Sequence, residues 1–377
     1  MKRLFLALAI ATWIANFTLA AEPAQLIKTI KAVGKEGQGN EAASQALREL
    51  AQADAKVLPT ILTSFDGANL LASNWLRSAV ETIADRTVKK GKDLPIVQLE
   101  QFVLDIKQNP RARRLAYEWL AKVDGEAQDR LIPGMLLDPS PEFRRDAVSR
   151  LIDSAKTAEA DKQRRGLYLQ ALKGATDDDQ VKAIVKPLRE MGEKVDLQRH
   201  FGFLANWQMI GPFNNRELVG FAATYPPENE VKLKAKYEGQ LGEVAWAPQS
   251  TKDDYGLLDI GKQIKNYKGS VMYATTEFTS STERPIEFRL GTPNAWKLWL
   301  NGKYLFGRDE YHRGTKMDQY RVAAKLKPGK NVILLKICQN EQEQSWAQRY
   351  QFQIRICEAS GVAVLPSTTR KTSQLSR

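Results

Sequence analysis

The chain has 377 residues, of which 43% are hydrophobic, and its formal net charge is +12. This length is enough for two or three domains, and the hydrophobic content is that of a globular chain and excludes a mainly disordered one. The positive charge is spread along the sequence, which is more typical of a solubility feature than of a binding site, so we expect no specific nucleic-acid partner.

The first twenty residues have the pattern of an export signal. Lys2 and Arg3 precede an apolar run over residues 4–14, and a small-x-small site for signal peptidase ends at Ala20. The apolar run is shorter than the roughly 20 residues that cross a bilayer, although a retained anchor is the alternative. The pattern predicts a signal peptide over residues 1–20, a periplasmic or extracellular location, and no transmembrane segment in the rest of the chain.

Residues 22–195 have a helical pattern that repeats. Apolar residues recur there at intervals of three and four, which is typical of short amphipathic helices. The segment "NPRARRLAYEWLAKV" aligns without a gap with "SPEFRRDAVSRLIDS", so that Pro110 matches Pro141 at an offset of 31. Such repeats indicate a helical solenoid, with an irregular helix bundle as the alternative. The segment "LDPSPEFRRDAVSRL" resembles a HEAT repeat, in which Asp and Pro precede an Arg-x-x-Ala helix, and we therefore expect a HEAT-like α-solenoid over this region.

After a linker near residue 195, the helical pattern gives way to alternating apolar and polar residues. Strand candidates separated by short turns indicate an antiparallel β-sandwich: "VMYATTEFTS", "IEFRL", "YRVAAKL", "NVILLKI" and "YQFQIRI". The segment "NVILLKI" is apolar on both faces, which predicts a central strand. The motifs "WKLWLNGKYLF" and "MDQYRVAAKLKPGKNVILLKI" resemble those of the galactose-binding-like jelly roll. The sequence thus predicts a multi-domain α plus β chain, with this β-sandwich over residues 200–360 and a disordered basic tail over residues 361–377.

The chain has two cysteines, Cys338 and Cys357, and two histidines. The cysteines are expected in the two arms of one hairpin, with a turn near residues 343–344. That register separates them along the strands by far more than the reach of a disulfide. We therefore expect free, buried cysteines and no disulfide. With only two cysteines and two histidines as possible ligands of these types, we expect no metal site. We also expect no cofactor.

The segment "WKLWLNGKYLFGRDEYHRG" is the candidate binding region. Asn301-Gly302 predicts a two-residue hairpin, and alternation places Trp296 on one face and Trp299 on the other. One tryptophan is expected in the core, while the other covers the outer face or stacks on a sugar, whose hydroxyls nearby polar groups can bind. A solvated turn with two packing tryptophans is the alternative. The candidate carbohydrate-binding residues are Trp299, Arg308, Asp309, Tyr311 and His312.

The sequence carries no local catalytic signature. There is no Gly-x-Ser-x-Gly elbow, zincin motif, P-loop or Rossmann glycine pattern, and neither histidine has a nucleophile nearby in sequence. We therefore expect an exported, non-catalytic binding or scaffold protein, whose sandwich contacts a glycan and whose helices dock an envelope or secreted protein.

Three alternative functions stay open. The chain could be a purely structural protein-interaction module. It could be a polysaccharide-acting hydrolase or an accessory subunit of one, because a pair of catalytic carboxylates has no recognisable spacing in sequence. It could also bind an anionic polymer through its charge, and its affinity would then fall steeply with salt.

Overall fold

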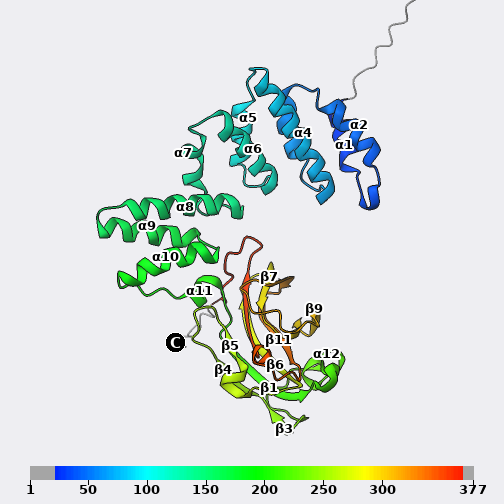
Figure 1. The fold of residues 1–377 in the computed structure, drawn as a ribbon, viewed down its shortest axis with the longest axis vertical. Helices are drawn as coiled ribbons and strands as arrows, with labels where there is room; N and C mark the ends of the chain where they lie inside the picture. Colours follow the sequence, from blue (N-terminus) through cyan, green and yellow to red (C-terminus); the bar gives the residue numbers. More distant parts are fainter. Residues whose placement is uncertain (1–21, 368–377) are drawn as a thin grey trace, which may run out of the picture. The chain divides into compact units, whose positions relative to one another are not determined.

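The computed structural model describes residues 22–367 and has helices in its N-terminal half and antiparallel sheets in its C-terminal half (Figure 1). The predicted change of pattern is therefore confirmed. The chain divides into two units between Phe143 and Arg144. The long helices end near the predicted boundary at residue 195. The last of these helices, however, belong to the same unit as the sheets. The predicted signal peptide lies outside the described residues.

Unit 1 consists of helices that pack mainly on their neighbours in sequence. Helix α1 packs on α2, α3 on α4, and α5 on α6. The helices are α1 (Pro23–Lys31), α2 (Asn40–Leu50), α3 (Leu58–Thr63), α4 (Leu70–Lys89), α5 (Ile96–Leu104), α6 (Pro110–Val123) and α7 (Ala127–Leu131). Small residues in the interior, such as Ala79 and Ala116, are fully buried, which lets the helices approach closely.

A buried ion pair joins two segments of unit 1. The Arg113 guanidinium donates to both carboxylate oxygens of Asp138, at 2.9 and 2.7 Å, and to the Val103 carbonyl at 2.7 Å. Arg113 is 1% exposed, and Arg144, which is 31 positions later in the repeat, is also buried at 6%. The repeated "Arg-Arg" pattern therefore places one arginine of each pair inside the helical packing.

Unit 2 contains four helices before the sheets. They are α8 (Pro141–Thr157), which crosses the unit division, α9 (Asp161–Gly174), α10 (Asp178–Glu190) and α11 (Leu197–Phe201). Helix α10 packs on α9 and is bound to a loop of the sheet region. Arg189 pairs with Asp254 at 2.8 and 3.0 Å, and Tyr255 donates to Asp178 at 2.7 Å. These contacts explain why the last helices and the sheets form one unit.

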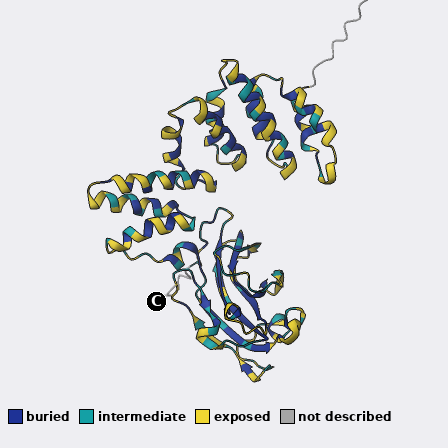
Figure 2. Cartoon of the chain, in the orientation of Figure 1, coloured by how far each residue is buried: buried dark blue, intermediate teal, exposed yellow. Residues whose placement is uncertain are grey.

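Two antiparallel sheets face each other across an apolar core. The six-stranded sheet has the order β4-β1-β6-β11-β8-β9, the four-stranded sheet has the order β10-β7-β12-β5, and β2 and β3 form a separate hairpin. The strands are β1 (Asn206–Asn214), β2 (Lys236–Gly239), β3 (Gly242–Ala245), β4 (Ala247–Ser250), β5 (Leu258–Asp259), β6 (Ser270–Ser280), β7 (Arg284–Gly291), β8 (Ala295–Leu300), β9 (Lys303–Arg308), β10 (Tyr320–Leu326), β11 (Gly329–Gln339) and β12 (Gln351–Cys357). Figure 2 shows that buried residues follow the strands of both sheets.

The six-stranded sheet is apolar on both faces. Strand β11 lies between β6 and β8, which confirms the predicted central strand. Its residues Ile333, Leu335 and Ile337 point into the core between the sheets. Leu334 and Cys338 point to the opposite face, where a second apolar cluster lies beneath the short helices α12 (Val219–Ala222) and α13 (Pro226–Asn229). We call this second cluster the outer layer.

The predicted hairpin is confirmed, and two other expectations need correction. Asn301 and Gly302 have φ of 53° and 78° and connect β8 to β9. Cys338 and Cys357 are free and buried, but their strands belong to different sheets, so the single hairpin predicted for them is wrong.

The packed chain also continues beyond residue 360, where a disordered tail was expected to begin. Val364 is 3% exposed, and the Ser367 amide donates to the Thr279 carbonyl at 2.9 Å. Residues 361–367 therefore lie against the sandwich, and residues 368–377 lie outside the described part. Among residues 22–367, no helix is long and apolar enough to cross a bilayer.

Arg355 and Asp318 form a buried ion pair that connects several segments of unit 2. Arg355, which is 1% exposed, donates to both Asp318 oxygens at 2.7 Å and to the carbonyls of Phe201 and Gly361 at 3.1 and 3.0 Å. Asp318 also accepts from Arg289 at 2.9 Å. The pair therefore connects β12 and β7 to helix α11, to the loop before β10 and to the segment after β12.

We expect Asp318→Asn to lower the free energy of unfolding by about 3–5 kcal/mol, because it leaves two buried guanidinium groups without their shared carboxylate. Urea denaturation of the full chain, followed by tryptophan fluorescence, measures the change. The matched control is Glu358→Gln, which removes the partly exposed pair with Arg284. Its effect should stay within about 1 kcal/mol. Equal effects of the two substitutions would contradict a structural role for the buried pair.

The same pair should make stability depend on pH. Burial opposes ionisation of Asp318, but Arg355 and Arg289 outweigh it and hold its pKa below the ordinary value. A carboxylate whose pKa is lower in the folded chain stabilises the fold above its unfolded pKa of about 3.9, and the contribution is lost as pH falls through the folded value. The difference in unfolding free energy between the wild type and Asp318→Asn should therefore shrink below about pH 4.

Candidate functional site

Two loops leave the same end of the six-stranded sheet and carry a polar and aromatic cluster. Strand pairing brings Ala295 opposite Cys338 and Trp296 opposite Arg308, so the loop after β9 and the loop after β11 start side by side. We call the following residues of these loops the end-loop cluster: Tyr311, His312, Asn340, Gln342 and Trp346.

His312 is the centre of this cluster. It has φ of 60°, and its backbone amide donates to the Pro293 carbonyl. The amide nitrogen of Asn340 lies 2.8 Å from His312 Nε2 and 2.9 Å from the Gln342 side-chain oxygen. An amide nitrogen can only donate, so His312 Nε2 is the acceptor in this contact. The ring is thus fixed by a hydrogen bond on one side and by its backbone on the other.

Trp346 lies against His312 and is mostly exposed. The two ring centroids are 4.8 Å apart at an interplanar angle of 85°, an edge-to-face contact. Trp346 is 59% exposed, which is the highest value among the aromatic residues of the described chain. The next is Tyr304 on β9, at 50%. The apolar surface of the indole is therefore available to a ligand.

Tyr311 connects the end-loop cluster to the outer layer. It packs on the outer layer and accepts a hydrogen bond at its hydroxyl from the fully buried Asn215 at 3.1 Å. Burial raises the pKa of Tyr311, so the phenol stays protonated near neutral pH. Asn215 also donates to the Gln339 carbonyl at 2.9 Å, next to Asn340. These contacts fix the two loops relative to each other.

The structure brings together only part of the predicted binding set. Tyr311 and His312 lie in the cluster. Trp299 is 6% exposed and packs within the outer layer, with Tyr304 edge-on at 5.6 Å, so it covers the sheet and offers no face to a ligand. Arg308 and Asp309 are exposed at the end of β9, and the Arg308 guanidinium lies 5.0 Å from the Phe306 ring centroid. The face assignment of the two tryptophans is confirmed, since Trp296 lies in the core between the sheets.

Sequence reasoning missed Trp346, Asn340 and Gln342. They lie in "QNEQEQSWAQR", a stretch of polar side chains with one tryptophan and no alternation. No hydrophobic periodicity surrounds this tryptophan, so the pattern does not predict that its ring faces the core. That absence of periodicity was the available signal for an exposed ring. Their closeness to His312 depends on strand pairing between distant segments, which the local pattern does not contain.

The outer layer also holds a buried charged group. Lys336 is 0% exposed, and its ammonium donates to Glu228 at 2.7 Å and to the carbonyls of Ala223 at 2.6 Å and Phe221 at 3.4 Å. Tyr273 donates to the same Glu228 oxygen. Burial lowers the pKa of Lys336, and the bond to Glu228 opposes this. Three acceptors use the three donors of the ammonium, which leaves none for a substrate and indicates that Lys336 anchors α12 and α13.

The remaining candidates for chemistry are isolated. His200 is half-buried and bonds through Nε2 to the Ala175 carbonyl at 3.0 Å, and burial lowers its pKa. Within residues 22–367, no group of three or more His, Cys, Asp or Glu side chains could hold a metal ion. We therefore take the end-loop cluster, an exposed indole beside polar side chains, as the candidate site of unit 2.

Comparison with protein-family models gives no match, and comparison with curated proteins gives none. Among the solved structures that match, three illustrate how weak the similarity is. The β-glucosidase from Kluyveromyces marxianus is 12% identical over 40% of this chain and 16% of that one, with a TM-score of 0.25. The GH31 α-xylosidase from Xanthomonas citri is 12% identical over 41% of this chain and 18% of that one, with a TM-score of 0.21.

The third is the Pseudomonas fluorescens alkylpurine DNA glycosylase AlkC bound to DNA, which is 11% identical over 90% of this chain and 94% of that one, with a TM-score of 0.19. This chain spans less than a fifth of the two glycosidase chains. All three TM-scores are too low to support an argument about fold or function, and the DNA complex says nothing about nucleic-acid binding here.

We expect Lys336→Met to lower the free energy of unfolding by about 3–5 kcal/mol, because Glu228 keeps a buried charge without its partner. The double variant Lys336→Met/Glu228→Leu removes both charges and should recover most of the loss. Urea denaturation gives the three stabilities, and limited proteolysis reports on the cover formed by α12 and α13. A double variant no more stable than Lys336→Met would show that the ion pair is not what holds this cover.

Proposed function

We propose that this chain is an exported, non-catalytic binding protein, in which the end-loop cluster recognises carbohydrate and the helices dock a protein partner. In this proposal the helices form a HEAT-like solenoid, supported by the buried Arg113 and Arg144 at the repeat offset. The sheets form a galactose-binding-like jelly roll, supported by two facing antiparallel sheets.

The observation that carries the carbohydrate proposal is the exposed indole of Trp346 beside His312. Large aromatic side chains are mostly buried in folded proteins, so one left 59% exposed among polar residues is an exception that a ligand would explain. A flat ring can cover the apolar face of a pyranose. The buried Asn340 amide nitrogen is used by His312 and Gln342, and the exposed Gln342 amide places a donor beside that ring for sugar hydroxyls.

The cluster is also fixed in place by the fold, which favours binding. His312 is held by the Pro293 carbonyl, and Tyr311 by Asn215. A site whose side chains are already ordered loses less conformational entropy when a ligand binds. Most of the hydrogen bonds that order it use backbone groups and amides, which leaves the indole face and the outer edge of the loop for the ligand.

We expect Trp346→Ala to weaken glycan binding at least tenfold, which corresponds to about 1.4 kcal/mol, because the stacking surface is removed. A glycan array of the full chain identifies a ligand, and isothermal titration calorimetry then compares the variants. Tyr304→Ala is the matched control, since Tyr304 is an aromatic residue of similar exposure outside the cluster.

Three outcomes would count against this function. Equal losses in both variants, or none in Trp346→Ala, would remove the cluster as the binding site. Absence of any bound glycan, with protein partners recovered from an envelope extract, would favour a purely structural interaction module. Cleavage of the bound glycan by the chain would show an enzyme.

A further inference from the structure

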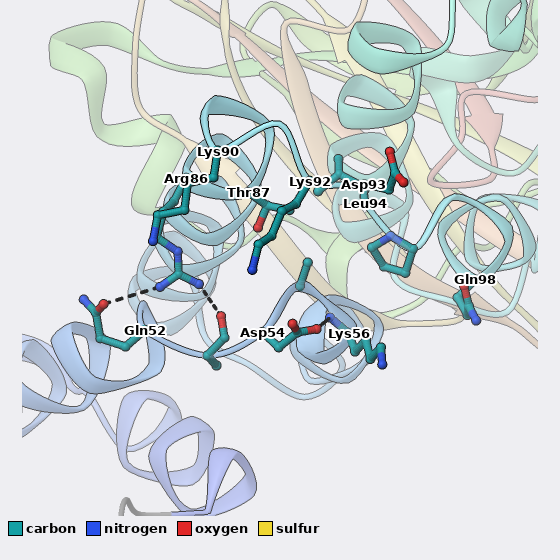
Figure 3. A pocket seen from close by; sticks show the side chains of 13 residues that line it. Gln52, Asp54, Lys56, Arg86, Thr87, Lys90, Lys92, Asp93, Leu94 and Gln98 are labelled. Atoms are coloured by element: carbon teal, nitrogen blue, oxygen red, sulfur yellow. Dashed lines mark hydrogen bonds between the residues drawn. The ribbon is translucent and has the colours of Figure 1, made fainter.

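A basic pocket lies in the helical unit 1, apart from the end-loop cluster. Its volume is about 700 Å³, and it is formed by the turn after α2, the end of α4 and the start of α5 (Figure 3). Four basic side chains line it: Lys56, Arg86, Lys90 and Lys92. Two acidic residues, Asp54 and Asp93, also line it, so the pocket has an excess of positive charge.

In the described part of the chain, the three lysines of this pocket have no acidic partner, as is also true of Lys28 and Lys35 outside it, and what distinguishes them is that they line one pocket. Among the described residues, Lys56, Lys90 and Lys92 are exposed and form no ion pair, whereas Arg113 and Arg130 each bind a carboxylate. The Asp54 carboxylate accepts the backbone amide of Lys56 at 2.9 Å and caps the short helix there, and it keeps its negative charge. Asp54 and Asp93 together offset only part of the charge of the four basic side chains. The ammonium groups are therefore available to an anion from outside.

Arg86 and helix α5 add fixed positive charge. The Arg86 guanidinium donates to the carbonyls of Ala51 and Ala53 and to the Gln52 side chain at 3.4 Å, as Figure 3 shows in part. These neutral acceptors hold the guanidinium in place and leave its charge uncompensated. Helix α5 begins at this pocket after Pro95 and has no side-chain cap, so its first-turn amides contribute partial positive charge.

We propose that this pocket binds the carboxylates of an acidic segment of a partner protein. The inference rests on the proposed docking role of the helices and names the chemistry of the partner. A protein carboxylate is the occupant because the proposed partner of the helices is a protein, and free ammonium groups bind a carboxylate as point charges. A polypeptide is favoured over a free anion because Leu94 and Pro95 also line the pocket and offer an apolar contact.

The test uses a fluorescein-labelled decaglutamate peptide and the full chain, with binding followed by fluorescence anisotropy. We expect the double variant Lys90→Gln/Lys92→Gln to bind at least tenfold more weakly than the wild type. The matched control is Lys28→Gln/Lys35→Gln, which removes the same charge from exposed positions of unit 1 outside the pocket and should change affinity less than twofold. Affinity should also fall as salt screens the charges.

Three competitors identify the class of anion that the pocket binds. Unlabelled decaglutamate should compete at least tenfold better than oligogalacturonate at equal carboxylate concentration, and inorganic phosphate should compete more weakly still. No binding by the wild type, equal losses in the two double variants, or equal competition by the polysaccharide or by phosphate would each overturn the proposal. Glycan binding that depends on Trp346 should be unchanged in Lys90→Gln/Lys92→Gln, so failure of one proposal is distinguishable from failure of the other.

Discussion

The bidentate pair between Arg355 and Asp318 is the constraint on which the architecture of unit 2 depends. A guanidinium that is 1% exposed is very unfavourable unless it is paired and hydrogen-bonded. Its four bonds reach the loop before β10, the end of α11 and the segment after β12. These segments are far apart in sequence. If one of them moved away, the buried Arg355 guanidinium would lose a hydrogen-bond partner.

This constraint also positions the end-loop cluster. The loop between β9 and β10 carries Tyr311 and His312, and it is held at its far end by Asp318 and near its middle by the Pro293 carbonyl. The neighbouring loop is held by the Asn215 bond to the Gln339 carbonyl. Two loops without regular structure thus acquire fixed geometry from buried polar contacts, which is the condition for a binding site of weakly interacting groups.

Local sequence patterns predicted the individual strands and turns of this fold better than they predicted which strands pair. The hairpin at Asn301 and the central position of β11 follow from turn chemistry and from an apolar run, both of which are local. The pairing of β12 with β7 is not local. The prediction assumed that strands adjacent in sequence pair with each other, and it therefore placed Cys338 and Cys357 in one hairpin. The site was missed for the same reason, because Trp346 and His312 meet through the register of β8, β9 and β11.

The lysines of this chain show why composition alone does not locate a site. Lys336 and Lys90 carry the same group, yet one is fully buried against three acceptors and the other is exposed without an acidic partner. The first contributes to the outer layer and the second to an electrostatic field around a pocket. A net charge of +12 counts both equally. What separates them is the geometry of their partners, so a charge becomes a candidate site only where the fold leaves it uncompensated beside a cavity.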